Sequence, residues 1–153
     1  MQLPRFFWRF MRFPRVFYNL GLAPILGRRV LLLTTTGRKS GRPHVTPLQY
    51  EEVEGLIYVG SARGVKADWY RNLQANPRVE VRLKSRRFHA QAEPITDRDR
   101  IVSFLELRLQ RHPRIMGRIM RLQGYPAKPS RAQLEQYAQK TGLVVLSPEQ
   151  EAA

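Results

Sequence analysis

Residues 31–43 carry the feature that most restricts the fold, a strand-forming run that breaks into a tight basic turn, LLLTTTGRKSGRP. Leucine and β-branched threonine favour a half-buried strand, whereas the two glycines permit a tight turn and close approach of the backbone to a ligand. The turn adds cations and hydroxyls that can donate to an anion: Arg38, Lys39, Arg42, Thr36 and Ser40. An ordinary basic hairpin loop has the same composition, so the turn alone leaves both interpretations open.

The composition predicts one folded domain with a strong positive field. A chain of 153 residues, 42% of them hydrophobic, is long enough to bury a core. Its net charge of +15 attracts nucleic acid, anionic lipid headgroups or a polyanionic small molecule. The absence of cysteine excludes disulfides and thiolate chemistry, which fits a cytoplasmic protein. No metal site is expected, because the three histidines lie far apart in the sequence: His44, His89 and His112.

Residues 1–28 are expected to form an amphipathic helical arm before a domain at 29–149. Phenylalanines fall at helical spacing there, with arginines beside them: Phe6, Phe10, Phe13, Phe17, Arg5, Arg9 and Arg12. An aromatic stripe flanked by arginines is typical of a helix lying among lipid headgroups. Residues 1–20 would then give peripheral contact with an anionic membrane, at the inner face of the cell membrane. The alternative is that the phenylalanines pack on the domain itself or on a second subunit.

The remainder reads as short strands separated by helices. Alternation and turn residues predict strands over 30–36, 44–51, 56–61, 78–84, 88–93 and 143–146. Pro47 implies a sheet edge or a bulge, because proline has no N–H for the ladder. Helices are expected over 69–75, from Thr96 to just before Pro113, over 115–122 and over 131–140, with Asp68, Thr96 and Ser130 as caps. The fold class is therefore α+β, a small split antiparallel β-barrel of about six strands with short helices.

The order of the motifs resembles a known family. The matching segments are residues 33–43 (LTTTGRKSGRP), 46–48 (TPL), 59–61 (VGS), 68–73 (DWYRNL) and 76–77 (NP). In this order they resemble the deazaflavin-dependent nitroreductase family, whose members bind coenzyme F420 on a split β-barrel. The similarity covers roughly residues 25–95, and residues 137–148 (YAQKTGLVVLSP) resemble the final helix and strand of the family.

The resemblance implies a set of cofactor-binding residues. The turn would contact the phosphate and the oligoglutamate tail, the segment after the third strand would run beside the ring, and the following helix would complete the pocket. The residues so assigned are Thr36, Arg38, Lys39, Ser40, Gly41, Pro47, Leu48, Ser61, Ala62, Arg63, Gly64, Trp69 and Asn72. The chain departs from the family pattern at residues 62–66, where relatives often have a lysine with two glycines, and at His44, where arginine is common.

The expected reaction is hydride transfer from reduced coenzyme F420 to a small-molecule quinone, nitroaromatic or enone-like acceptor. The cofactor carries the difficult chemistry, so the protein must mainly bind, align and exclude water. A proton must also reach the acceptor. Tyr137 and Tyr125 are the candidate donors or substrate-side residues, because a phenol can hydrogen-bond the acceptor atom.

Two other functions remain open at this point. A split-barrel flavoprotein that binds FMN would also need a phosphate site, although the basic excess favours the longer acidic tail of F420. A nucleic-acid-binding barrel is permitted by the charge, but the cations are dispersed and the strands lack a clear row of outward aromatic residues. Relatives with a split barrel include monomers and homodimers, so either state is expected.

Overall fold

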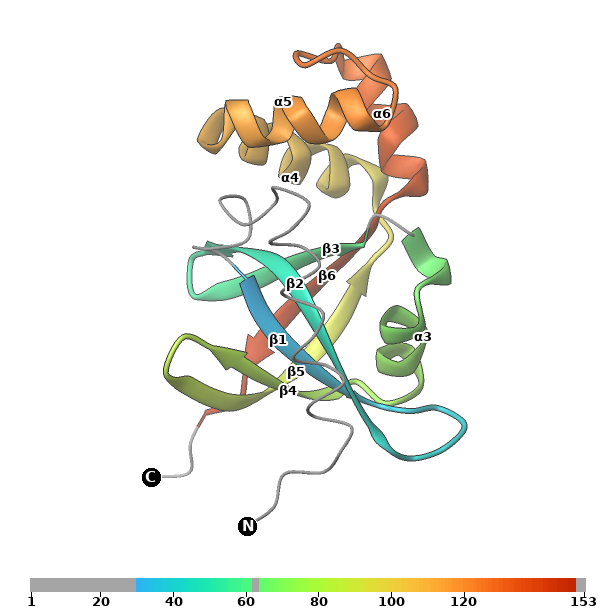
Figure 1. The fold of residues 1–153 in the computed structure, drawn as a ribbon, viewed down its shortest axis with the longest axis vertical. Helices are drawn as coiled ribbons and strands as arrows, with labels where there is room; N and C mark the ends of the chain where they lie inside the picture. The colour runs from blue at the N-terminus through green and yellow to red at the C-terminus, as the bar shows by residue number, and fades with distance from the viewer. Residues whose placement is uncertain (1–29, 62–63, 151–153) are drawn as a thin grey trace.

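The computed structural model describes residues 30–61 and 64–150, which form a closed six-stranded barrel with helices at one end and one side (Figure 1). The strands run in the order β1-β2-β3-β6-β5-β4, and every neighbouring pair is antiparallel. Their bounds are β1 Val30–Thr36, β2 Pro43–Val53, β3 Leu56–Ser61, β4 Arg78–Leu83, β5 Arg86–Ile95 and β6 Gly142–Pro148. The predicted α+β barrel of six strands is confirmed, while the predicted arm at 1–28 lies outside the described residues.

The helices divide into two groups. The turn η1 (Gly64–Lys66) and helix α3 (Asp68–Ala75) connect β3 to β4, and α3 lies along the side of the barrel close to the β1–β2 turn (Figure 1). Helices α4 (Arg98–Arg111), α5 (Pro113–Leu122) and α6 (Arg131–Lys140) gather at one end and are called the helical cap below. None of the helices in the described ranges has both the length and the hydropathy that a bilayer crossing requires.

The register of β1 and β2 decides which side chains enter the barrel. Leu31 pairs with Leu48, Leu33 with Thr46 and Thr35 with His44. Because directly opposed residues project from the same face, and because Leu31 and Leu33 are fully buried, this set faces the interior. The intervening residues of β2 therefore face outward, namely Val45, Pro47, Gln49 and Glu51.

Pro47 lies beyond the end of the β2–β3 ladder of the closed barrel. The ladder between β2 and β3 runs from Val53↔Leu56 to Tyr50↔Val59 and ends there, whereas β2 continues to pair with β1 as far as Pro43. Pro47 thus lies where β2 pairs with β1 alone, opposite Leu32. Of the edge or bulge predicted at this proline, the structure has an edge, on the side of β2 away from β1.

Two apolar clusters fill the molecule. One lies inside the barrel and includes Leu31, Val59, Tyr70, Leu73 and Val81. The other joins the outer face of β3 and β6 to the helical cap, and its buried members include Val102, Leu105, Met116, Met120 and Val145. The second cluster fixes the cap to the barrel, since burial of each large side chain contributes roughly 1.5–3 kcal/mol.

Three helix starts differ from the sequence predictions. Asp97, not Thr96, caps α4, because its carboxylate accepts from the N–H groups of Asp99 (2.9 Å) and Arg100 (3.2 Å). Asp68 is the first residue of α3 and makes no cap bond, since Ala67 occupies the cap position. Helix α5 begins two residues early, at Pro113, where proline suits the first helical turn. The cap at Ser130 is confirmed: its hydroxyl accepts from the N–H of Gln133 at 3.3 Å.

Candidate functional site

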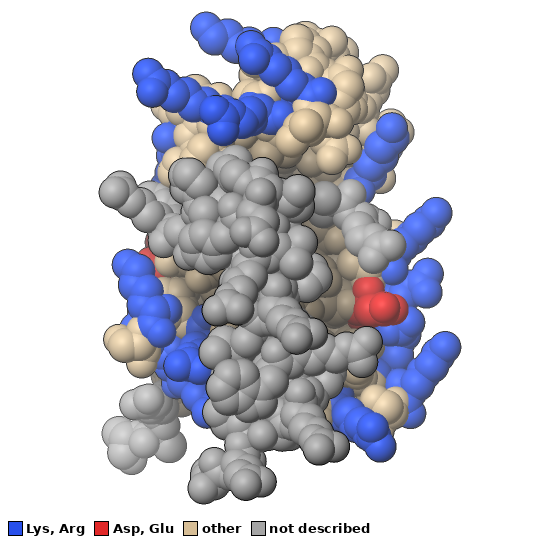
Figure 2. All heavy atoms as spheres, in the orientation of Figure 1, with Lys and Arg blue, Asp and Glu red and all other residues tan. Residues whose placement is uncertain are grey.

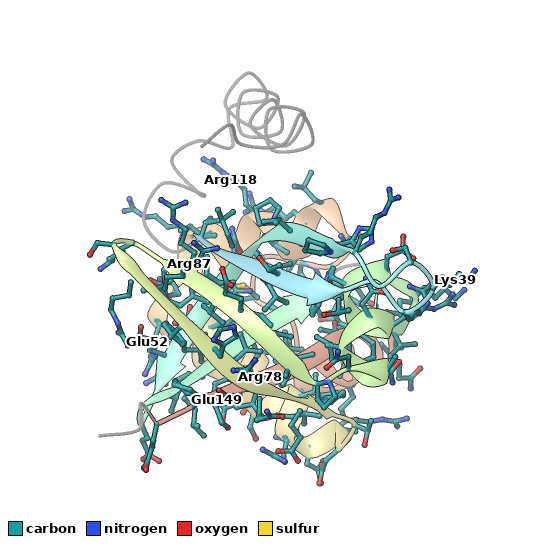
Figure 3. All side chains as sticks on the ribbon, turned by 90° about the horizontal axis from the view of Figure 1, so that it is seen from below. Lys39, Glu52, Arg78, Arg87, Arg118 and Glu149 are labelled. Atoms are coloured by element: carbon teal, nitrogen blue, oxygen red, sulfur yellow. The ribbon has the colours of Figure 1, made fainter. Side chains whose placement is uncertain are left out.

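A cavity of about 410 Å³ lies between the β1–β2 turn and helix α3. The lining residues come from the turn, from the start of β2 and from one face of the helix: Gly37, Arg38, Lys39, Ser40, His44, Val45, Thr46, Asp68, Trp69 and Asn72. Segments 30 residues apart in the sequence therefore meet in one site. In Figure 3 Lys39 lies at the outer edge of the turn and points away from the barrel.

The turn holds its own shape through backbone hydrogen bonds. The N–H of Gly37 donates to the carbonyl of Arg42 (2.8 Å), and the N–H of Gly41 donates to the carbonyl of Gly37 (2.9 Å). Gly41 has φ +68°, a left-handed conformation that glycine adopts without steric cost. The hydroxyl of Ser40 accepts from the N–H of Arg42 at 3.2 Å. Lys39 thus stands at the tip of a closed loop.

Helix α3 fixes Arg38 through one buried side chain. The Oδ1 atom of Asn72 accepts from the backbone N–H of Arg38 (3.2 Å) and from its Nη1 (2.9 Å). The Nδ2 atom of Asn72 donates to the hydroxyl of Thr35 at 3.3 Å. Asn72 is 3% exposed and Thr35 is 1% exposed, so these groups depend on one another for hydrogen bonds. The guanidinium is consequently held in place before any ligand arrives.

The cavity is lined by more basic than acidic side chains. Arg38 and Lys39 line it, and Asp68 is the one carboxylate among the lining residues. The Nη2 atom of Arg38 lies 3.2 Å from the carboxylate of Asp68, which is 86% exposed. Lysine and arginine side chains also surround the outline of the molecule (Figure 2). An anionic ligand is therefore attracted both by the lining and by the overall field.

The structure brings together some of the residues predicted for the cofactor. Arg38, Lys39, Ser40, Trp69 and Asn72 all line the cavity. Thr36 ends β1 and Gly41 belongs to the turn, and neither lines the cavity. Ala62 and Arg63 lie outside the described residues.

The other assigned positions lie further along the barrel. Pro47 faces outward from β2, and Leu48 packs against the barrel core. Ser61 ends β3, opposite Gly142, with 4% of its surface exposed. Gly64 begins η1 with φ +63°, and a Cβ there would lie 2.5 Å from the carbonyl oxygen of Lys140. The segment after β3 therefore touches the C-terminal end of α6.

The two tyrosines proposed as proton donors lie in the helical cap. Tyr137 on α6 and Tyr125 in the loop after α5 meet edge to face, with ring centroids 5.8 Å apart. Neither tyrosine lines the cavity at the β1–β2 turn. Burial raises the pKa of Tyr137 above its usual value of 10.0, partly opposed by the positive charge of Arg108. The phenol of Tyr137 therefore keeps its proton throughout the neutral range.

A buried cluster of charged and polar side chains joins the cap to the outer face of β2, and no local sequence pattern predicted it. Glu51 is 1% exposed, and its carboxylate lies 2.8 Å from Nε2 of His112, 3.3 Å from Nη1 of Arg111 and 3.7 Å from Nε of Arg108. Arg108 also donates to Oε1 of Gln49 at 3.0 Å. Burial lowers the pKa of the Arg108 guanidinium, which Glu51 opposes.

Sequence reasoning also missed part of the cavity lining. Five lining residues were not assigned to a ligand: Gly37, Val45, His44, Thr46 and Asp68. The register of the β1–β2 hairpin is the signal that could have identified the first two, because it places both flanks of the turn beside the same space. Across residues 30–61 and 64–150, no group of three or more metal-ligating His, Asp or Glu side chains comes together.

Comparison with known sequences points to one family. The sequence model of the F420H(2)-dependent quinone reductase family matches residues 18–120. An F420H(2)-dependent quinone reductase of Mycobacterium tuberculosis is 39% identical over 72 residues, which cover 45% of this chain and 48% of that protein. The chain thus spans about half the length of the curated relatives it matches.

Comparison with solved structures establishes the fold. A conserved hypothetical protein from Mycobacterium tuberculosis matches with a TM-score of 0.59 at 19% identity, covering 82% of this chain and 76% of that one. An F420-H2 dependent reductase, FDR-A, matches with a TM-score of 0.54 at 22% identity, covering 78% of this chain and 95% of that one. At these identities the likeness extends to the fold alone.

Proposed function

Because the chain belongs to the F420H(2)-dependent quinone reductase family, we propose that it is an oxidoreductase that transfers a hydride from reduced coenzyme F420 to a quinone. Nitroaromatic compounds and activated alkenes are alternative acceptors, since they too accept a hydride and a proton. The relatives with this activity are named for a quinone, which makes quinones the first acceptors to test.

The observation that carries this proposal is the cavity between the β1–β2 turn and α3. It combines two cations, two hydroxyl groups and a turn with two glycines around one space of about 410 Å³. This donor set fits a ligand with a phosphate and a chain of carboxylates. In a chain of net charge +15, such a ligand is also favoured over a neutral one.

Different residues of the cavity would contact different parts of the cofactor. Arg38, Lys39 and Ser40 would hold the phosphate and the acidic tail, with Asn72 keeping Arg38 in position. Trp69 would form an apolar wall, since it lines the cavity and is 7% exposed. Reduced F420 supplies the hydride when bound, so the chain needs to bind, align and exclude water.

Tyr137 is our candidate for the residue on the acceptor side. It lies one helical turn before Lys140, whose carbonyl oxygen packs against Gly64 at the segment assigned to the ring. A phenol that stays protonated in the neutral range can donate to a quinone or nitro oxygen. Tyr125, in edge contact with it, is the second candidate.

A titration of the purified chain with F420 and, in parallel, with FMN tests the cofactor. We expect saturable binding of F420 that is tighter than that of FMN, because FMN has the phosphate without the oligoglutamate tail. Lys39→Gln should weaken F420 binding, whereas Lys84→Gln removes an equal charge at the distant β4–β5 turn and should not. Tighter binding of FMN would replace this proposal by the flavoprotein alternative.

Oxidation of F420H2 by a panel of quinones, nitroaromatics and enones then tests the reaction. Turnover with quinones is the expected result. Binding of F420 without turnover of any acceptor in the panel would reduce the proposal to a cofactor-binding protein.

The setting proposed for the enzyme is the cytoplasm, with residues 1–20 in peripheral contact with an anionic membrane. Lipophilic quinones dissolve in the bilayer, so such contact would bring the site to its substrate. Deletion of residues 1–28 should reduce sedimentation with anionic vesicles while leaving F420 affinity nearly unchanged. Ultracentrifugation of the full chain would distinguish a monomer from a homodimer.

A further inference from the structure

Helix α5 has an unusual distribution of charge. Its sequence, PRIMGRIMRL, contains three arginines and no acidic residue. Arg114, Arg118 and Arg121 follow the spacing i, i+4, i+7, which places them within about 60° around a helix of 3.6 residues per turn. They therefore form one continuous ridge along the helix.

This ridge is exposed, and no acidic residue of the described ranges neutralises it. Arg114, Arg118 and Arg121 are all exposed, and no carboxylate of residues 30–61 or 64–150 forms an ion pair with them. Figure 2 shows basic side chains over the end of the molecule formed by the cap, with no acidic side chain among them in that view. Arg118 points away from the ribbon in Figure 3. By contrast, two exposed arginines elsewhere are paired, Arg78 with Glu149 and Arg131 with Glu106.

One exposed apolar side chain, Leu122, borders the ridge, and the half-buried Ile115 lies on the same side of the helix. Leu122 is 79% exposed, and it and Val65 are the exposed large hydrophobic side chains of the described chain. On the helical wheel Leu122 and Ile115 lie next to the arginines, about 80–100° from Arg114. The opposite side of α5 is occupied, because Met116 and Met120 are buried in the cap.

We propose that this face of α5, consisting of Arg114, Arg118, Arg121 and Leu122, docks on the surface of an anionic lipid bilayer. Unpaired arginines beside an exposed leucine suit the headgroup region, where charge meets lipid phosphate and the apolar side chain enters the acyl boundary. A nucleic-acid backbone would satisfy the arginines but would leave the leucine exposed. The lipid surface is the partner that uses both features.

The position of α5 makes this docking compatible with an accessible cavity. The helical cap and the β1–β2 turn lie toward opposite ends of the molecule (Figure 1). A cap on the membrane would leave the turn facing water, where a polyanionic ligand is dissolved. This face of α5 is distinct from the cavity, so its docking does not depend on whether the bound cofactor is F420.

Co-sedimentation of the full chain with vesicles tests the proposal. The vesicles are phosphatidylcholine alone, or phosphatidylcholine mixed with phosphatidylglycerol. The variant Arg114→Gln/Arg118→Gln/Arg121→Gln should partition at least about tenfold more weakly onto the anionic vesicles at low ionic strength. The matched control, Arg82→Gln/Lys84→Gln/Arg86→Gln, removes the same charge from the β4–β5 hairpin and should retain most of the binding. Circular dichroism and thermal unfolding establish that both variants are folded.

A tryptophan at the end of the ridge gives a second readout. The emission of Leu122→Trp, compared with that of the parent chain, should shift to shorter wavelength on anionic vesicles and remain unchanged on neutral ones. Equal losses in the two triple variants would show that net charge alone is responsible and would overturn the assignment to α5. Undiminished vesicle binding by the α5 variant would also overturn it. A third contrary result is a parent chain that does not bind vesicles but binds an oligonucleotide, with this binding lost in the α5 variant.

Discussion

The side chain of Asn72 on α3 holds Arg38 of the β1–β2 turn by two hydrogen bonds, one to its backbone N–H and one to its guanidinium. These residues are 34 positions apart, and the contact ties the turn to the side of the barrel. Asn72 is thus a positioning residue for the basic turn. This arrangement predicts how the cavity responds to substitution.

Asn72→Ala should lower both stability and affinity for an anionic ligand. The change removes three hydrogen bonds and leaves the buried hydroxyl of Thr35 without its donor, which costs about 1–3 kcal/mol. Thermal unfolding measures the first effect, and titration with F420 should show about tenfold weaker binding. The control is Gln74→Ala, which removes an exposed amide from the same helix. It should change the unfolding temperature and the F420 affinity by less. A stable variant with unchanged affinity would show that Arg38 needs no such support.

Asp68→Asn should strengthen the binding of anions. Asp68 is 86% exposed, so its ion pair with Arg38 contributes at most about 1 kcal/mol to stability. Removing its charge frees the guanidinium and eliminates repulsion of an anionic ligand. The dissociation constant for F420 should fall about two- to fivefold at low salt, and the gain should shrink as salt is added. Weaker binding would instead indicate that Asp68 itself contacts the ligand.

Gly64→Ala should destabilise the chain more than Gly41→Ala. Both glycines have φ above +60°, so alanine costs about 1–2 kcal/mol of backbone strain at each. At Gly64 the new Cβ would also lie 2.5 Å from the carbonyl oxygen of Lys140, whereas at Gly41 nothing lies within 4 Å. The difference between the two unfolding free energies in urea isolates the contact with α6. Equal losses of unfolding free energy in the two variants would mean that η1 shifts away from α6 at no measurable cost.

Glu51→Gln should reduce the free energy of unfolding by about 3–5 kcal/mol. It removes the carboxylate that Arg108 and Arg111 face beneath the cap, and the guanidinium of Arg108, which is 17% exposed, would lose this counterion. Glu106→Gln, whose ion pair with Arg131 is exposed, should cost less than about 1 kcal/mol. Equally small losses of unfolding free energy for Glu51→Gln and Glu106→Gln would show that water reaches the cluster around Glu51.

Stability should decline in alkaline solution above pH 10. Burial raises the pKa values of Tyr70 and Tyr137 above their usual 10.0, so above this pH the folded chain retains protons that the unfolded chain has lost. Unfolding then releases protons, and the free energy of unfolding falls as pH rises. Tyr137→Phe should make this decline shallower. An unchanged slope would indicate that the phenol ionises in the folded state as it does in water.

Local patterns were sufficient to predict most of the fold. The alternation in residues 78–83 and the leucine–threonine run at 30–36 each define an inner and an outer face, so the strands could be placed without knowledge of their partners. Ser130 has Gln133 at the position that a capping box requires, and the structure has both bonds. Thr96 failed as a cap because Asp97, one residue later, is the stronger acceptor at the start of α4.

Contacts between distant segments could not be predicted in the same way. Glu51 lies in an acidic run, Glu51-Glu52-Val53-Glu54, that reads as an exposed hairpin. Its burial depends on where α4 ends after packing against the outer face of β2, which no local pattern specifies. The bond between Asn72 and Arg38 likewise exists only once α3 lies against the barrel. The resemblance placed Asn72 in the pocket without revealing its partner.

The strand order also has a consequence for biosynthesis. β6 lies between β3 and β5, yet it is translated after the other five strands. The nascent chain therefore carries two unpaired strand edges until β6 emerges, and such edges invite pairing with other chains. The turn and α3 are translated long before the barrel that supports them can close. A cofactor that binds between the turn and α3 can therefore stabilise the closed barrel only after β6 has been translated.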